Sequence, residues 1–221
     1  MPSKLVPIYL FSVCATVIAW AAASEGSQGA TQGMPSPPPK VDNREVSTAT
    51  DGSRRVLRLD EREGDGVAWW PDLVMADGTI EVDIRGRDLT GRSFVGVAFH
   101  GVDEKTYDVV YFRPFNFKSA DPVRLSHGVQ YIAHPTYTWN KLRTERPDEF
   151  EHQVSPAPDP NGWFHARIVV KFPEVRVFVD GSEQPSLEVK QLSTRKSGWI
   201  GVWVGNGSNG EFANLEVVPA Q

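Results

Sequence analysis

Residues 198–217 read Gly198-Trp199-Ile200-Gly201-Val202-Trp203-Val204-Gly205-Asn206-Gly207-Ser208-Asn209-Gly210-Glu211-Phe212-Ala213-Asn214-Leu215-Glu216-Val217. Two short alternating apolar segments in this stretch flank a turn that is rich in Gly and Asn. Both segments are too short and too broken by glycine for helices, and their alternation is typical of strands. We expect them to form the closing hairpin of an antiparallel β-domain.

The same alternation recurs along the chain between turn signals, and no segment has a sustained helical period. A clear example is residues 79–85, where Ile80, Val82 and Ile84 share one face. The expected strands are residues 54–59, 79–85, 93–100, 107–112, 129–132, 164–172, 175–179, 198–204 and 210–217. Asp180-Gly181 predicts a chain reversal. So many strands without helices between them predict an all-β fold, a two-sheet antiparallel jelly-roll sandwich.

The amino-terminal residues predict a signal peptide over residues 1–23, with a basic start, an apolar run and a cleavage site near Ala23. Residues 24–40 are rich in Pro, Gly and Ser and predict a disordered linker. Residues 41–221 are expected to form the sandwich. The only cysteine, Cys14, lies within the signal, so the exported chain would contain no disulfide. We expect a secreted or periplasmic bacterial protein without membrane insertion after cleavage.

The formal net charge of −5 disfavours a nucleic-acid or anionic-membrane partner. The five histidines form no His-x-x-x-His pattern, so no metal or other cofactor is expected. Calcium bound by loop oxygens near residues 159–162 is the alternative, although that loop is also typical of a simple turn. No Gly-x-Ser-x-Gly motif is present.

Several segments resemble the concanavalin A-like lectin/glucanase superfamily, with the strongest likeness to bacterial exported domains of the 3-keto-disaccharide hydrolase type. They are residues 77–83, 94–99, 111–117, 163–165 and 201–215. The resemblance implies the jelly-roll fold and a carbohydrate partner. Laminarinase-like members carry Glu-x-Asp-x-Glu on one strand, but here Glu81 and Asp83 are followed by Arg85. The second catalytic carboxylate is therefore missing, and these residues are expected to form a solvated strand face.

A sugar site combines aromatic rings with polar side chains that bind hydroxyl groups. Arg113 follows Tyr111 at a spacing of two, so both side chains are expected on one sheet face. With His100 and Gln130 from neighbouring strands they would line a concave binding face. Further binding candidates are Asn116 and Trp139. In the alternative interpretation, Arg113 pairs with a structural carboxylate such as Asp108 or Asp121.

Among the tryptophans, Trp199 and Trp203 are expected in the core, whereas Trp69 and Trp139 are expected in loops where they could bind a ligand. The catalytic candidates are Glu151 and His100, although no spacing requires either role. Three functions remain open: a carbohydrate-binding module, a glycoside-processing enzyme, and a structural or adhesion domain.

Overall fold

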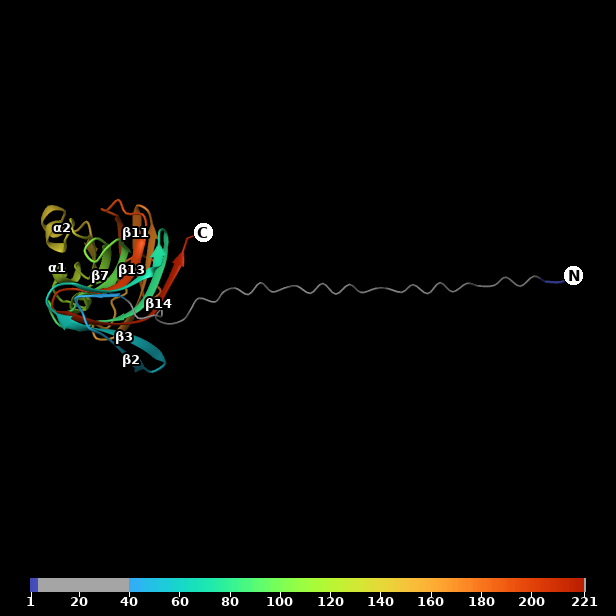
Figure 1. Cartoon of the computed structure of the whole chain (residues 1–221), viewed down its shortest axis with the longest axis horizontal. Helices are drawn as coiled ribbons and strands as arrows, with labels where there is room; N and C mark the ends of the chain where they lie inside the picture. Colours follow the sequence, from blue (N-terminus) through green and yellow to red (C-terminus); the bar gives the residue numbers. More distant parts are fainter. Residues whose placement is uncertain (4–39, 221) are drawn as a thin grey trace.

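The computed structural model describes residues 1–3 and 40–220. Residues 40–220 form a β-sandwich with two short α-helices at one side (Figure 1). Sheet A has the strand order β1-β4-β13-β6-β7-β8-β9, and sheet B has the order β12-β11-β10-β5-β14-β3-β2. All strand pairs are antiparallel. The predicted jelly-roll sandwich is therefore confirmed. Nearly all of the predicted signal peptide and linker lies outside the described residues.

The elements have the following bounds. The strands are β1 Lys40–Asp42, β2 Val46–Asp51, β3 Arg54–Arg62, β4 Gly66–Met75, β5 Gly78–Arg85, β6 Val95–Gly101, β7 Asp108–Phe112, β8 Val129–Ala133, β9 Glu151–His152, β10 Trp163–Lys171, β11 Glu174–Val179, β12 Leu187–Lys190, β13 Gly198–Val204 and β14 Ser208–Pro219. The helices are η1 Pro114–Asn116, α1 Pro122–Leu125 and α2 Trp139–Glu145.

The core lies between the two sheets and follows the alternation of the strands. On β5, Ile80, Val82 and Ile84 are fully buried. Phe112 of sheet A meets Phe164 of sheet B with their ring centroids 4.9 Å apart, so the two inner faces are in direct contact. The opposite face of sheet A is consequently free to carry a site.

The expected closing hairpin is wrong, because β13 and β14 belong to different sheets. β13 pairs with β4 and β6, whereas β14 pairs with β3 and β5. The connection at residues 205–207 therefore carries the chain from one sheet to the other. Alternation and a Gly-rich turn predict two strands and a reversal, but they do not determine which partners each strand finds.

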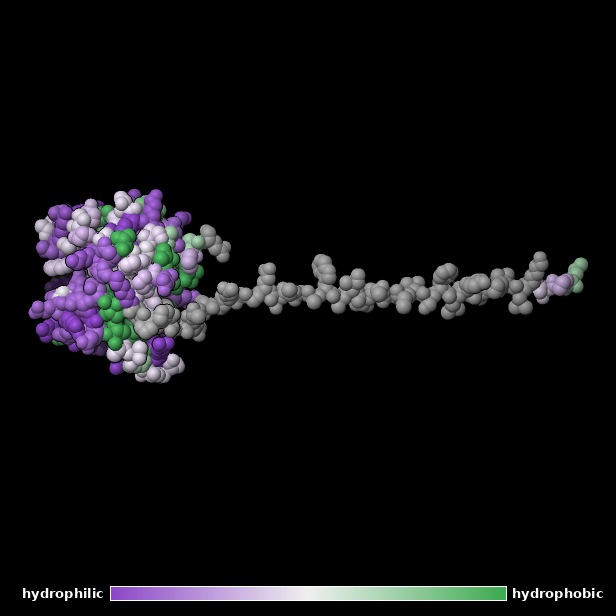
Figure 2. Space-filling view, viewed as in Figure 1, coloured by the Kyte–Doolittle hydropathy of each residue, from purple (hydrophilic) through white to green (hydrophobic). Residues whose placement is uncertain are grey.

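The prediction that Trp69 lies in a loop is also wrong, since it belongs to β4 and is fully buried. The helices that the sequence did not predict are only three to seven residues long, too short to produce a periodic signal. Within the described ranges, no helix is long and apolar enough to cross a membrane. Figure 2 shows a mainly hydrophilic surface on the visible face of the domain, with hydrophobic residues in small separate groups.

Candidate functional site

A single row of residues crosses sheet A from strand to strand. The register aligns Trp203 of β13, Gly96 of β6, Tyr111 of β7, Gln130 of β8 and Glu151 of β9. Aligned residues of neighbouring strands project to the same face of a sheet. Their sequence neighbours, such as Phe112, point into the core, so the row faces away from sheet B.

Gly96 has no side chain, which allows the aromatic residues on either side of it in the row to come into contact. A Cβ atom at this position would clash with the carbonyl oxygen of Val110 and would lie only 2.8 Å from the Cβ of Tyr111. Without that atom, the Tyr111 and Trp203 rings approach to a centroid distance of 5.1 Å across the glycine. The glycine therefore lets two aromatic rings, tilted by 45° to each other, form a continuous floor between β7 and β13.

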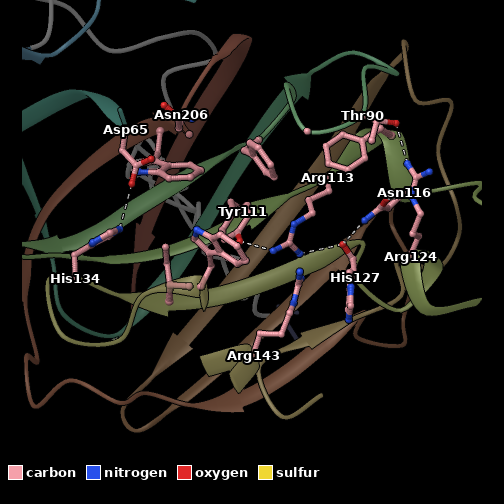
Figure 3. A pocket seen from close by; sticks show the side chains of 17 residues that line it. Asp65, Thr90, Tyr111, Arg113, Asn116, Arg124, His127, His134, Arg143 and Asn206 are labelled. Carbon is pink, nitrogen blue, oxygen red and sulfur yellow. Dashed lines mark hydrogen bonds and ion pairs between the residues drawn. The ribbon is translucent and has the colours of Figure 1, made fainter. Parts of the chain in front are cut away.

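A cavity of about 460 Å³ lies over this floor (Figure 3). Its walls come from the β3–β4 and β5–β6 loops, η1, α1, α2 and the segment after β13. The lining residues are Asp65, Thr90, Gly91, Phe94, Tyr111, Arg113, Phe115, Asn116, Arg124, His127, Ile132, His134, Trp139, Arg143, Trp203, Gly205 and Asn206. Trp139 is 49% exposed at the first residue of α2. Aromatic rings and polar side chains therefore line the same open cavity.

Arg113 is the best-connected cation of the cavity and is only 4% exposed. Its Nη1 donates to the carbonyl oxygen of His127 at 3.0 Å and to Oε2 of Glu151 at 3.2 Å. Its Nη2 donates to the hydroxyl of Tyr111 at 2.5 Å and also to Oε1 of Gln130. The structure therefore brings together three of the four residues that the sequence placed on this face, Arg113, Tyr111 and Gln130.

The carboxylate partner of Arg113 is neither of the two that the alternative interpretation named. Asp108 pairs with Arg195 at 3.2 Å, and the Asp121 side chain caps α1. Glu151 takes this role instead, because β9 extends sheet A by one strand beyond Gln130.

Glu151 lies beneath the cavity rather than in its lining and is 3% exposed. It accepts from Nε and Nη2 of Arg143 at 2.9 and 2.6 Å. Burial acts to raise the pKa of Glu151, but the hydrogen bond and charge of Arg143 and the charge of Arg113 lower this pKa below its usual value. Glu151 is therefore an ionised anchor for two guanidinium groups, which does not suit a proton donor.

The prediction that His100 lies on the same sheet face as Tyr111 and Arg113 is wrong. β6 contains a bulge where its register with β13 shifts, and His100 has a φ of +50°. The bulge breaks the alternation, so His100 is fully buried away from the cavity. Its Nε2 lies 3.0 Å from the carbonyl oxygen of Ala76, and its Nδ1 lies 3.1 Å from Nε2 of Gln191.

The far end of the cavity from Arg113 contains an aspartate–histidine pair, Asp65 and His134, that the sequence did not predict (Figure 3). Oδ2 of Asp65 lies 3.5 Å from Nε2 of His134. Burial raises the pKa of Asp65 and lowers that of His134, so the pair is poised toward its uncharged forms. Asp65 lies between two glycines in a loop, and no local pattern distinguishes it from an ordinary turn residue.

Glu81 and Asp83 lie on β5 of sheet B, outside the cavity. Asp83 accepts from Nε of Arg54 at 3.3 Å, and its Oδ1 lies 2.9 Å from Nδ1 of His165. In residues 1–3 and 40–220, no group of three or more His, Cys, Asp or Glu side chains is arranged to hold a metal ion.

Comparison with known proteins shows which β-sandwich proteins this chain resembles. No protein-family model matches the chain, and no curated protein matches it. Carbohydrate binding module CBM66 from Bacillus subtilis is 15% identical, with a TM-score of 0.55 over 81% of this chain and 92% of the module. The fold is that of galectin-like and lectin sandwiches.

Two further solved structures support this assignment of the fold. A protein of unknown function with a galectin-like fold from Bacillus subtilis is 13% identical, with a TM-score of 0.53 over 81% of this chain and 88% of its own. The exoplasmic/lumenal domain of VIP36, in its Ca²⁺/Man3GlcNAc-bound form, is 12% identical, with a TM-score of 0.52 over 82% and 84%. At these identities the likeness concerns the fold, and function must be argued from the site.

Proposed function

We propose that this protein binds a glycan in the cavity over sheet A. The observation that carries the proposal is the lining, in which the rings of Trp139, Trp203 and Tyr111 share one open cavity with amide, carboxylate and guanidinium groups. A sugar offers apolar ring faces for stacking and hydroxyl groups for such polar partners. Two structural neighbours, a carbohydrate binding module and a lectin domain bound to Man3GlcNAc, support the proposal by analogy.

The open cavity favours binding over a purely structural role, because a structural domain would be expected to fill this face with packed side chains. It also favours binding over ordinary glycoside hydrolysis. Hydrolysis uses two carboxylates on opposite sides of the scissile bond. Asp65 is the only carboxylate among the described residues that line the cavity.

A direct test compares Trp139→Ala with the unchanged full chain on a glycan array and by calorimetry. Loss of the exposed ring should weaken glycan binding about tenfold, the upper range for one aromatic contact. Val102→Ala is the matched control, since Val102 is 52% exposed but lies outside the cavity. Equal affinity of both variants for every bound glycan would place the binding site elsewhere.

A second candidate is a glycoside-processing enzyme of the 3-keto-disaccharide hydrolase type, and the observation that favours it is Asp65. Burial raises the pKa of this carboxyl, so its ionised form is a stronger base than an ordinary aspartate. A 3-keto group acidifies the neighbouring C–H bond, so the Asp65 carboxylate can take that proton and return it to the glycosidic oxygen as the C–O bond breaks; addition of water to the resulting double bond completes the hydrolysis. Release of sugar from a 3-keto-disaccharide, lost in Asp65→Asn, would establish the enzyme; binding without product supports the first proposal.

We further propose that residues 1–23 direct export and that residues 24–40 form a linker to the sandwich. The basic and apolar residues before Ala23 support this division. Mass spectrometry of the protein expressed in a bacterial host should find Ser24 as the new amino terminus in the exported fraction. Retention of Met1 in exported protein would contradict the proposal.

A further inference from the structure

One end of the cavity carries more positive charge than the surrounding residues neutralise. Arg113, Arg124 and Arg143 all line it. Among the described residues, Glu151 is the only carboxylate within ion-pair distance of any of them. Three guanidinium groups and one carboxylate leave an excess of two positive charges at this end.

Arg124 accounts for much of this excess because both of its partners are neutral. Its Nε donates to Oδ1 of Asn116 at 3.3 Å, and its Nη2 donates to the hydroxyl of Thr90 at 2.9 Å. These two contacts hold the guanidinium at the cavity wall without neutralising it (Figure 3). His127 adds no charge at pH 7, since burial lowers its pKa below the usual value.

The opposite end of the cavity offers hydrogen-bond acceptors instead of cations. Asp65 and Asn206 lie there, and both offer oxygen atoms that accept hydrogen bonds from hydroxyl groups. The cavity is therefore polarised along its length, with guanidinium groups at one end and acceptors at the other. A neutral sugar would leave the guanidinium end uncompensated, whereas a carboxylate or sulfate matches the planar fork of an arginine.

We infer that the ligand is an anionic glycan whose carboxylate or sulfate group binds at Arg113, Arg124 and Arg143, while its hydroxyl groups face Asp65 and Asn206. This inference rests on the proposed function and adds the class of saccharide to it. The overall charge of −5 does not oppose it, because charges more than about 10 Å away are largely screened at 0.1 M salt.

The test measures affinity for two matched pairs of saccharides with the full chain. Trigalacturonate is compared with its methyl ester, and a sulfated carrageenan oligosaccharide with its desulfated form, so the two sources of negative charge are separated. Each ligand is titrated into the unchanged protein and into Arg124→Gln. The control is Arg92→Gln, which removes the same charge from a residue of the β5–β6 loop that does not line the cavity.

The expected result is tighter binding of at least one charged form than of its neutral partner, with a loss of about tenfold in Arg124→Gln, the scale of one charge-assisted hydrogen bond. Arg92→Gln should match the unchanged protein. Neutral saccharides that bind equally well, with no effect of Arg124→Gln, would overturn the inference and leave the proposed function intact. Binding of no saccharide, charged or neutral, here or on the array, would overturn both.

Discussion

Glu151 holds the buried side of the cavity together, because it neutralises Arg113 from within the protein. Arg113 is 4% exposed and Glu151 is 3% exposed. Glu151→Gln removes the negative charge and leaves a buried guanidinium unpaired, so we expect the free energy of unfolding to fall by about 3 kcal/mol. The control is Glu149→Gln, which removes an exposed carboxylate paired with Arg146 and should change stability by about 1 kcal/mol or less. Urea denaturation of both variants measures the difference, and equal losses would contradict the anchoring role of Glu151.

His165 on sheet B gives stability a dependence on pH. The hydrogen bond to Asp83 raises the pKa of His165 above its usual value of 6.5. A raised pKa in the folded state stabilises the protein fully below pH 6.5, and this contribution is lost as the pH rises through the folded-state pKa. The stability advantage over His165→Gln should therefore shrink above pH 6.5. Denaturation at a series of pH values tests this, with His152→Gln as the control for an exposed histidine; an advantage that grows with pH would refute it.

The pairing of β6 with β7 depends on the absence of a side chain at Gly96. A methyl group there would meet the backbone of β7 at Val110 and the side chain of Tyr111. We expect Gly96→Ala to destabilise the protein by about 2 kcal/mol, as overpacking in a closed site does. It should also separate Tyr111 from Trp203 and weaken ligand binding. Thermal unfolding and titration of the same variant measure both effects, and unchanged values for both would show that the glycine is not needed here.

Strands were the part of the fold that the sequence predicted best, because alternation is a local property. The clear pattern of Ile80, Val82 and Ile84 corresponds to β5 with its inward face fully buried. Pairing was not predictable in the same way, as β13 and β14 show by joining different sheets. The bulge in β6 reversed the expected direction of His100, and a bulge leaves no mark in the pattern of residue types.

Part of the candidate site was predicted from the sequence, on the sheet face and outside it. Tyr111 and Arg113 were grouped by their spacing of two and Gln130 was assigned to the neighbouring strand, while Asn116 and Trp139, which also line the cavity, lie on η1 and α2. Asp65 and Arg124 reach the cavity from separate connections, and only the tertiary structure brings them together. Residues from separate connections share no pattern along the chain, so a single sequence does not show that they line the same cavity.

The molecule as a whole has one core, since both sheets contribute to the same layer of buried side chains. We expect a single cooperative unfolding transition, with tryptophan fluorescence and far-UV circular dichroism changing together. Four of the tryptophans, Trp69, Trp70, Trp199 and Trp203, belong to sheet A, so fluorescence reports mainly on that sheet. Separate midpoints for the two signals would mean that the sheets unfold independently.

Unfolding of the full chain should also be insensitive to reducing agents. Cys14 is the only cysteine of the chain, so no disulfide can form within one molecule. The midpoint of thermal unfolding should be the same with and without dithiothreitol. A shift on reduction would point to disulfide-linked dimers, which a non-reducing gel would detect.

The row from Trp203 to Glu151 takes one residue from each of five adjacent strands, and the neighbours of those residues along each strand face the core. The row itself is tied to stability, because Tyr111 and Trp203 belong to the buried core and Glu151 is the carboxylate partner of Arg113. The exposed wall residues Thr90, Trp139 and Asn206 come from outside the strands and have no such role. Natural variation or laboratory selection can therefore change the wall of the cavity while its floor stays constant, so that a new specificity needs only a few substitutions at exposed positions.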